Sequence, residues 1–504
     1  MKERWFNYRP LCLVCAFLLL GSVFSFFITT HPVLTIISTI VVAAILVVIA
    51  ILKKKQRYVL IPLIAFALGI GMYMIAVHSF NKTVDYTPST IQARIYNITN
   101  EKDGMVVAYA DSIEFDNENI NDNLKIIIYD NDGLFENIAI GSIIKFKPFR
   151  FYKSDLFYNI IPDSRVYSED LKYTTSVLFD DITYIGTDKT LAEIAKENIK
   201  ENLSLGLTNE NTEIAYSALF GDKDLLSDKQ YNAYKLSGVA HLLAVSGLHV
   251  GIIVGILNWI CKWFKIKRWY KLALIASFLL LYMHLCDYSV SIIRASIMSL
   301  VAIVAGIMKR EYDPFNSIAL AGIVIFFINP LCIFDVSFLL SFACVLGITI
   351  LYMPIEKALS KTKMPHKIVK SVAISLSTTI AIVFIMAYFF RTLNIISIIA
   401  NVVLIPIFTL AFEVTFVVSF ISIAIPYVSY LLYPINYIFD FINIVATVLG
   451  NLAISNFNTI TFNFIAIIIY FVLLLFLGRF CTARYQYKMI TALPMVALLF
   501  YCLL

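Results

Sequence analysis

The segment HLLAVSGLH, residues 241–249, places two imidazoles and one hydroxyl inside an otherwise apolar stretch. Such groups can act as a nucleophile with its base, as metal ligands, or as the lining of a polar passage. His241 and Ser246 are five positions apart, so a helix brings them only roughly onto one face. No acidic residue nearby completes a triad with them, and no third ligand nearby completes a metal site. We therefore predict neither a catalytic residue nor a metal here, and we favour a structural or passage-lining role.

Further polar side chains recur in the apolar segments that follow. Arg294 lies near the end of one of them, and on a helix it shares a face with Asp287, seven positions earlier. Pairing of these two charges is one interpretation, and contact of Arg294 with an anionic substrate is the other. Because polar groups at membrane depth are costly unless they face protein or water, we predict a polar path through the bilayer. Its candidate residues are His241, Ser246, Gly247, His249, Arg294, Asp335, Ser341, Arg391, Asn401 and Glu413.

A third group of residues interleaves cations with aromatic rings. Proteins that bind single-stranded nucleic acid use this composition, because bases stack on the rings while cations follow the backbone. A β-barrel that buries its rings and exposes its cations gives the same pattern. Residues 79–207 hold 21 acidic and 13 basic side chains, and this net charge of −8 opposes DNA binding by the bulk field. The candidate DNA contacts are Lys145, Lys147, Arg150, Tyr152 and Lys153.

The composition indicates which elements position these residues. Of the 504 residues, 60% are hydrophobic and 15% are charged, whereas soluble proteins carry about 25% charged residues. A spanning helix needs about 20 mostly apolar residues, and we predict a polytopic α-helical membrane protein with about 13 transmembrane helices. The predicted spans are 11–28, 33–52, 58–78, 239–260, 269–285, 288–308, 314–333, 336–353, 369–390, 393–424, 434–453, 462–478 and 487–503. The span 393–424 contains Pro406 and is expected to be kinked or divided in two.

The basic loops predict the orientation. They are 53–57, 261–271, 309–310, 357–370 and 479–488. All of them fall on one side of the membrane if the N-terminus is cytoplasmic, as the positive-inside rule requires. The acidic residues 79–207 then lie outside the cytoplasm.

The polar insert is predicted to be rich in β-strands. Apolar and polar residues alternate near 91–95, and further strand candidates are 105–113, 124–129 and 143–151. These strands favour a small antiparallel barrel or sandwich, followed by an amphipathic helix near 191–203. The predicted domains are N-terminal transmembrane helices at 1–78, the extracytoplasmic β domain at 79–188, amphipathic and connecting helices at 189–237, and a transmembrane core at 238–504.

Five segments together resemble the ComEC family of competence DNA-uptake channels. In chain order they are GDKD (221–224), HLLAVSGLHV (241–250), SIIRASIM (291–298), NPLCIFDVSFLLSF (329–342) and FFRTLNIISIIANVVLIP (389–406). The resemblance implies a bacterial inner-membrane protein that passes one DNA strand into the cytoplasm during natural transformation, with an OB-like fold in the insert. It assigns His241, Ser246, Gly247 and His249 to the hallmark segment. It assigns Arg294, Asp335 and Ser341 to later motifs.

The same resemblance bears on enzyme activity and partners. Many family members carry a C-terminal metallo-β-lactamase-like nuclease domain, but this chain has no HxHxDH motif and ends at Leu504. It also has no GxxxxGK[ST] phosphate loop. We therefore expect no enzyme activity and no cofactor in this chain. The expected partners are single-stranded DNA, the lipid bilayer, a surface DNA receptor, a separate nuclease and a cytoplasmic ATP-driven motor; the sequence does not fix the oligomeric state.

Three alternatives stay open at this point. A small-solute secondary transporter would be favoured by an internal inverted repeat, and the sequence offers no convincing one. An intramembrane hydrolase would use Ser246 as its nucleophile. A member of the family with another membrane role would keep the transmembrane core without transporting DNA.

Overall fold

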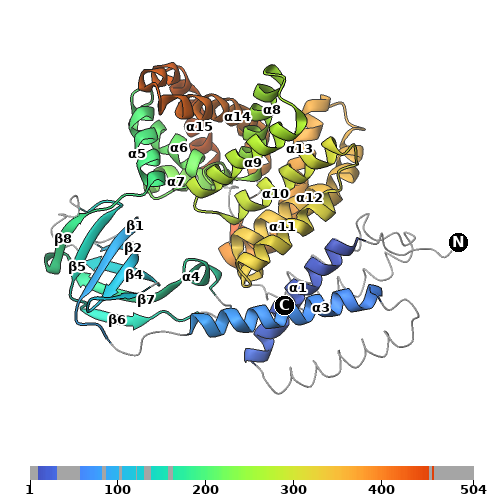
Figure 1. The fold of residues 1–504 in the computed structure, drawn as a ribbon. Coiled ribbons are helices and arrows are strands. Elements are labelled where there is room, and N and C mark those ends of the chain that lie inside the picture. Colours follow the sequence, from blue (N-terminus) through green and yellow to red (C-terminus); the bar gives the residue numbers. More distant parts are fainter. Residues whose placement is uncertain are drawn as a thin grey trace. The chain divides into compact units, whose positions relative to one another are not determined.

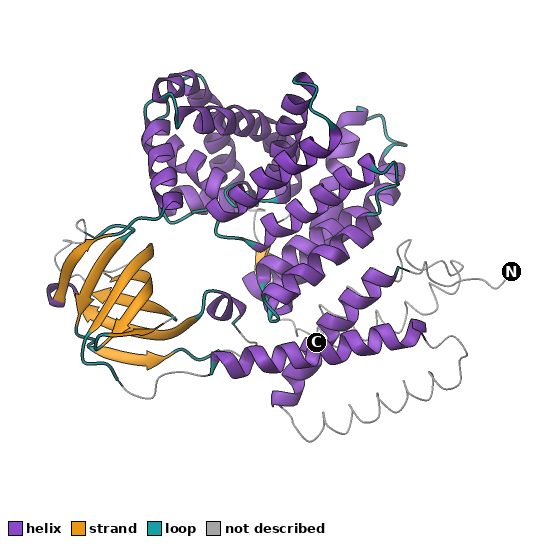
Figure 2. Cartoon of the chain, viewed as in Figure 1, coloured by secondary structure: helices purple, strands orange, loops and turns teal. Residues whose placement is uncertain are grey.

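The structure is a computed structural model, and its description covers residues 9–30, 57–81, 87–101, 105–120, 122–129, 138–156, 163–394, 396–452 and 457–458. The chain divides into two compact units. We call residues 1–12, 200–322 and 336–504 the helical unit, and residues 13–199 and 323–335 the sheet unit. Helices dominate the described residues, and Figure 2 shows the larger strands gathered in one sheet.

The strands of the sheet unit follow the alternation in the sequence. They are β1 (Ile91–Glu101), β2 (Met105–Phe115), β3 (Glu118–Ile120), β4 (Asn123–Tyr129), β5 (Ser142–Phe146), β6 (Arg150–Lys153), β7 (Leu171–Leu178) and β8 (Ile182–Thr187). The order is β6-β7-β4-β2-β1-β5-β8, with β3 on β2 (Figure 1). Only β4 and β7 pair in parallel within this sheet. Inward-facing residues of these strands, such as Ile91, Ala93 and Ile95, form its core.

The predicted strand at 143–151 is two strands. It breaks between Phe146 and Arg150, where Pro148 lacks the N–H that a ladder needs. As a result β5 pairs with β1 and β8, whereas β6 pairs with β7 at the other end of the order. Because only residues 147–149 join them, the sheet must curl on itself. Strands β7 and β8 are not among the predicted strands. For β7 the sequence does hold a strand pattern, because Tyr173, Thr175 and Val177 stand at alternate positions.

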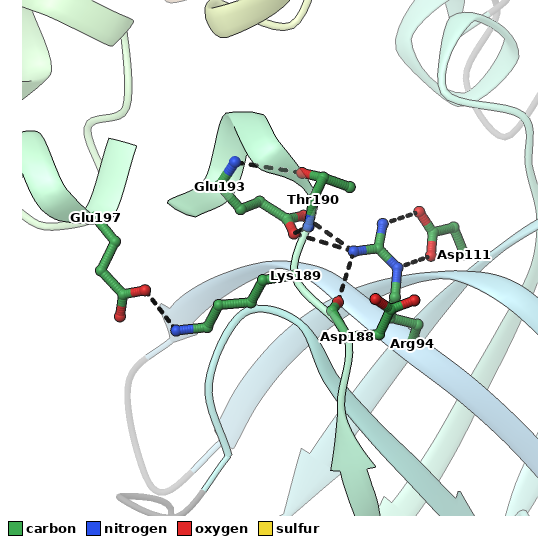
Figure 3. A network of polar contacts seen from close by, with 7 residues as sticks. All are labelled: Arg94, Asp111, Asp188, Lys189, Thr190, Glu193 and Glu197. Atoms are coloured by element: carbon green, nitrogen blue, oxygen red, sulfur yellow. Dashed lines mark hydrogen bonds and ion pairs between the residues drawn. The ribbon is translucent and has the colours of Figure 1, made fainter. Parts of the chain in front are cut away.

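One ion-pair network ties the helix α5 (Leu191–Ser204) to the sheet (Figure 3). The Arg94 guanidinium on β1 donates to Asp111 on β2 over 2.9 and 2.7 Å and to Glu193 on α5 over 3.1 Å. Its hydrogen bond with Asp111 raises the pKa of Arg94. Glu193 also accepts the N–H of Thr190 at 2.7 Å, and Thr190 Oγ1 accepts the N–H of Glu193 at 3.2 Å. This reciprocal capping fixes the first turn of α5 against the sheet.

The sheet unit also holds most of α1 (Pro10–Thr30) and all of α3 (Arg57–Phe80). A side chain at Gly21 would collide with the carbonyl of Phe66, and one at Gly69 with the carbonyl of Leu18. The two glycines therefore allow a close approach of the two backbones, as small residues do between membrane helices. A short helix α4 (Ser164–Ser168) precedes β7.

The helical unit is built mainly from apolar helices. Its elements are α6 (Asn209–Phe220), α7 (Asp228–Leu236), α8 (Gly247–Trp263), α9 (Arg268–Leu285), α10 (Val290–Ile307), most of α11 (Pro314–Ile328), α12 (Val336–Leu359), α13 (His366–Phe390), α14 (Ser397–Ser422), α15 (Ile435–Gly450), and the short strands β9 (Thr392–Leu393) and β10 (Phe457–Asn458). Helices α12 and α13 are joined by a short link and pack extensively on each other (Figure 1).

Six of the described helices are long and apolar enough to cross a membrane, and a seventh span results if the pair Pro426–Leu432 and α15, bent by 50°, counts as one. Each of the ten predicted spans within the described residues contains a helix. The predicted spans 33–52, 462–478 and 487–503 lie outside the described residues. Within the predicted span 393–424 the structure has one helix, α14, with Pro406 inside it. Multiple apolar helices thus agree with the predicted membrane protein, and the total of about 13 stays a prediction.

Candidate functional site

Helix α8 begins later than the sequence predicts. The span expected from residue 239 becomes a helix only at Gly247, after a 3-10 turn at Ala240–Leu242. The cause lies upstream, where Gly238 has a φ of +78° and a side chain there would meet that of Ser397. A left-handed glycine ends the helical path after α7, so the chain must turn before α8 starts. The hallmark segment therefore contains a helix N-terminus.

Ser246 and His249 form the cap of that N-terminus. The Ser246 backbone N–H donates to His249 Nδ1 at 3.0 Å, and the Ser246 hydroxyl lies 3.0 Å from the same nitrogen. Since Nδ1 accepts this bond, the neutral ring carries its proton on Nε2. His249 is fully buried, with its ring centroid 5.7 Å from that of Phe408 and 4.4 Å from that of Phe412 on α14. The imidazole is thus a capping group in an aromatic contact, and its place in the lining of a polar path stays a prediction.

The contact between Ser246 and His249 also bears on the hydrolase alternative. A catalytic serine needs a base that a third group orients. Nε2 of His249 has no hydrogen-bond partner among the described residues. In the described part of the chain, no group of three or more His, Cys, Asp or Glu side chains is arranged to hold a metal ion.

Arg294 on α10 is a buried cation. Only 6% of the residue is exposed. Its Nε donates to Ser341 Oγ on α12 at 2.6 Å, and the Ser291 hydroxyl donates to the same oxygen at 3.2 Å. One terminal nitrogen lies 3.9 Å from Met298 Sδ. No ion pair joins Arg294 to a described carboxylate, and Asp287 lies before α10 begins at Val290, so the pairing with Asp287 that the sequence left open is absent.

The other terminal nitrogen of Arg294 faces the first turn of α8. A Cβ atom on Gly247 would lie 3.1 Å from it. Because Gly247 has no side chain, the guanidinium can approach the turn where the helix presents unpaired N–H groups. A helix N-terminus carries a partial positive charge. The Arg294 guanidinium and the first turn of α8 at Gly247 thus concentrate positive potential at one buried point, which favours an anion.

A hollow of about 590 Å³ runs along one face of α8. It is lined by Gly247, Leu248, Gly251, Ile252, Gly255, Ile256 and Trp259 together with Glu413 of α14. Side chains added at Gly251 or Gly255 would meet no atom within 4 Å. Gly251 and Gly255 were not among the predicted site residues, although the spacing Gly247-x3-Gly251-x3-Gly255 places all three glycines on one helix face.

The remaining candidates of the polar path lie on other elements of the chain. His241 is exposed in the 3-10 turn. Arg391 is exposed and ends α13 with a φ of 54°. Asn401 Nδ2 lies 3.4 Å from Ser375 Oγ. Asp335 belongs to the sheet unit. Of the predicted residues, the contacts therefore unite Gly247, Arg294 and Ser341, pair Ser246 with His249, and bring Glu413 to the hollow.

The predicted DNA contacts of the insert lie mainly along β6. Lys147, Arg150, Tyr152 and Lys153 are exposed, whereas Lys145 on β5 is half-buried. Phe149 is 65% exposed, and the Arg150 guanidinium lies 5.6 Å from the centre of its ring. Phe151 points the other way, with its ring centroid 5.5 Å from that of Phe115 and 5.4 Å from that of Tyr173. The strand thus buries one ring and exposes cations and aromatics together.

Comparison with known proteins places the chain in a family. A family model described as "Competence protein" matches residues 218–484, more than half of the chain. ComE operon protein 3 of Bacillus subtilis is 30% identical over 206 residues, which are 40% of this chain and 25% of that protein. Recombination protein 2 of Haemophilus influenzae is 28% identical over 173 residues, which are 32% of this chain and 22% of that protein. No solved structure matches the chain.

The matched regions span about a quarter of the length of these curated relatives. The family model covers α8, α10, α12 and α14, the helices that carry the cap, the buried arginine and the hollow. The resemblance deduced from the sequence motifs is therefore confirmed, and the chain belongs to the ComEC family of competence proteins.

Proposed function

We propose that this protein takes part in DNA uptake during natural transformation, and that a single DNA strand crosses the membrane along the glycine-lined face of α8. The observation that carries the proposal is the buried Arg294 guanidinium, which has no described carboxylate partner and faces the N-terminal turn of α8. Burial of an unpaired cation costs several kcal/mol by its lost hydration. A passing phosphate would offset that cost, because it accepts hydrogen bonds from a guanidinium in a matching planar geometry.

The hollow beside this point suits a chain of nucleotides. Its volume of about 590 Å³ accepts ring-sized groups, and Trp259 supplies an aromatic surface on which a base can stack. Gly247, Gly251 and Gly255 keep one side of α8 free of side chains. We assign the phosphate contact to Arg294 and the N–H groups of the first turn, and the positioning of Arg294 to Ser341. Glu413 also lines the hollow. Its negative charge repels the phosphates and weakens the binding of the strand enough for the strand to leave.

We further propose that the insert is an OB-like domain that contacts DNA before it enters. The strand order, with the third long strand β4 parallel to β7 and the β5–β6 segment bridging β1 and β7, supports an OB-like barrel. The exposed cations and rings of β6 support the contact. Lys145, half-buried on β5, is the weakest member of this predicted set.

The placement in the membrane is also a proposal. With a cytoplasmic N-terminus, the basic loops face the cytoplasm and residues 79–207 lie outside, in an inner-membrane protein of about 13 spans. The domain boundaries 1–78, 79–188, 189–237 and 238–504 follow from that arrangement. Transport of a polyanion needs a driving force, for which we propose a cytoplasmic ATP-driven motor. A surface receptor and a separate nuclease would supply the strand.

The proposal predicts the effect of removing the charge of Arg294. Arg294→Gln should lower DNA entry by about 10- to 100-fold, because a hydrogen bond to a charged group contributes about 1.5–3 kcal/mol. Arg294→Lys should recover part of that loss. The measurement is the entry of labelled DNA into cells whose sole copy is the full-length variant, with DNA bound at the surface scored separately.

The matched control is Arg310→Gln, which removes an exposed arginine beyond the end of the same helix. Membrane levels of all variants are compared by immunoblot. Loss of entry with unchanged surface binding supports the proposal. Normal entry in Arg294→Gln cells contradicts it.

A further inference from the structure

A second cavity of about 570 Å³ lies in the helical unit, on another face of α8. Val254 and Asn258 of α8, Arg268 and Lys271 at the start of α9, and the end of α10 around Gly306 form its walls. Val254 and Asn258 lie on one helix face, adjacent to the face of Gly251 and Gly255, but this cavity and the hollow share no lining residue. The cavity is therefore distinct from the proposed DNA path.

The polar part of this cavity carries positive charge without a counter-charge. Neither Arg268 nor Lys271 forms an ion pair or a side-chain hydrogen bond with any residue that the structure describes. Asn258 adds an amide that can donate two hydrogen bonds. The rest of the lining is apolar or small, as at Ala302 and Ile303. Two free cations above an apolar wall match a ligand with an anionic head and an apolar body.

The surroundings of the cavity point to the membrane interface. Trp259, Trp263 and Trp269 are three of the four tryptophans of the chain, and they flank the α8–α9 link. They are 60%, 68% and 64% exposed. Tryptophan side chains gather where headgroups meet hydrocarbon, because the ring is apolar and its N–H is polar. These three exposed rings therefore indicate that the neighbouring Arg268 and Lys271 lie at the depth of the lipid headgroups.

We propose that this cavity binds one anionic phospholipid, with the phosphodiester held by Arg268, Lys271 and Asn258 and the glycerol and upper acyl chains against α10. Basic pockets between membrane helices recognise anionic headgroups in this way. A DNA phosphate has the same charge, but nucleotides would not profit from the apolar wall beside Ile303. The site would anchor the α8–α9 link against the bilayer.

The test is native mass spectrometry of the purified full-length protein, released from mixed micelles of dioleoylphosphatidylglycerol and dioleoylphosphatidylcholine. We expect the wild type to retain one phosphatidylglycerol in preference to phosphatidylcholine. Arg268→Gln/Lys271→Gln should weaken that retention about thirtyfold. Each cation near an anionic lipid surface contributes about 1 kcal/mol to binding, and the loss of both corresponds to that factor. The control Lys262→Gln/Lys265→Gln removes the same charge from the same link at side chains that do not line the cavity.

A second variant fills the cavity without changing its charge. A side chain at Gly306 meets no atom within 4 Å, so Gly306→Leu fits without a backbone clash and projects into the cavity. Retention should fall in Gly306→Leu and stay unchanged in Gly71→Leu, a comparable open glycine on α3. Equal retention by wild type and all variants would overturn the proposal, as would equal loss in both double variants. Selective loss of single-stranded oligonucleotide binding in Arg268→Gln/Lys271→Gln, with lipid retention unchanged, would also overturn it and assign the cavity to DNA.

Discussion

At the residue scale, the same hallmark segment holds side chains with different tasks. His249 and Ser246 look from the sequence like a pair that could line a passage or do chemistry. Their contacts make them a helix cap, with the imidazole packed against Phe408 and Phe412. Arg294 is the opposite case, because its nearest contacts leave part of the guanidinium without an acceptor among the described residues. We therefore assign the proposed anion contact to Arg294 and the backbone at Gly247.

The cap interpretation predicts a change in stability. His249→Ala should lower the free energy of unfolding by about 1–3 kcal/mol, because it removes a capping group and a buried ring. His249→Gln should lose less, since glutamine three positions after a serine cap can bond to the cap N–H. Thermal melting of the full-length protein in detergent measures both. A His249→Ala melting temperature equal to that of the wild type would contradict the cap role.

These residues could be identified from the sequence, but not which of them cap the helix and which face a possible anion. Cap geometry depends on where a helix starts, and the start of α8 is set by the left-handed Gly238, outside the motif. The serine that holds Arg294 comes from α12, 47 positions away. Spacing along one helix cannot reveal such a partner, so the sequence left only pairing with Asp287 or contact with an anionic substrate as interpretations of Arg294.

At the element scale, the Arg94 network ties the first turn of α5 to the sheet. Residues 191–199 of this helix belong to the sheet unit and residues 200–204 to the helical unit. The exposed fractions of the side chains are 11% for Arg94, 30% for Asp111 and 16% for Glu193, so water screens their attraction only in part. Removal of the cation would leave two carboxylates facing each other, which is more costly than the loss of an exposed pair. The network therefore predicts that the first turn of α5 depends on a residue of β1.

Arg94→Gln should open the start of α5, with a loss of about 1–3 kcal/mol in local stability. Hydrogen exchange of the full-length protein checks this by the protection of amides in residues 191–197. The control is Lys189→Gln, which removes the ion pair between Lys189 and Glu197, where Glu197 is 49% exposed and the expected effect is small. Unchanged protection in Arg94→Gln would refute the dependence.

Strand and helix predictions differ in how far the sequence could carry them. The runs of apolar residues predicted a helix in each span that the structure describes, because the lipid-facing and the buried faces of such helices are both apolar. The sheet was harder, since β6 and β7 meet only after the curl that Pro148 initiates. Pairing between distant strands is a property of the folded sheet and leaves little trace in a local pattern.

At the scale of the whole molecule, the chain combines two units that are discontinuous in sequence. Residues 323–335 pack with the sheet unit although they lie among the later membrane segments. Phe334 explains this locally, because its ring lies 5.5 Å from that of Phe26 on α1 and 6.4 Å from that of Tyr73 on α3. The predicted domains are continuous ranges such as 79–188, so they do not describe a late segment that packs with an earlier unit. A shift in composition along the chain does not reveal such packing.

The proposed passage of DNA along the glycine-lined face of α8 can be tested with a covalent trap. Gly251→Cys places a thiol in the hollow, where a side chain meets no atom within 4 Å. Leu280→Cys on α9, 60% exposed and outside both cavities, is the control. Each cysteine variant is first shown to take up unmodified DNA. The cells are then given single-stranded DNA that carries thiol-reactive groups on its backbone. We expect a protein–DNA adduct at position 251 and none at position 280. Continued uptake without an adduct at 251 would exclude this face of α8 as the path of the DNA.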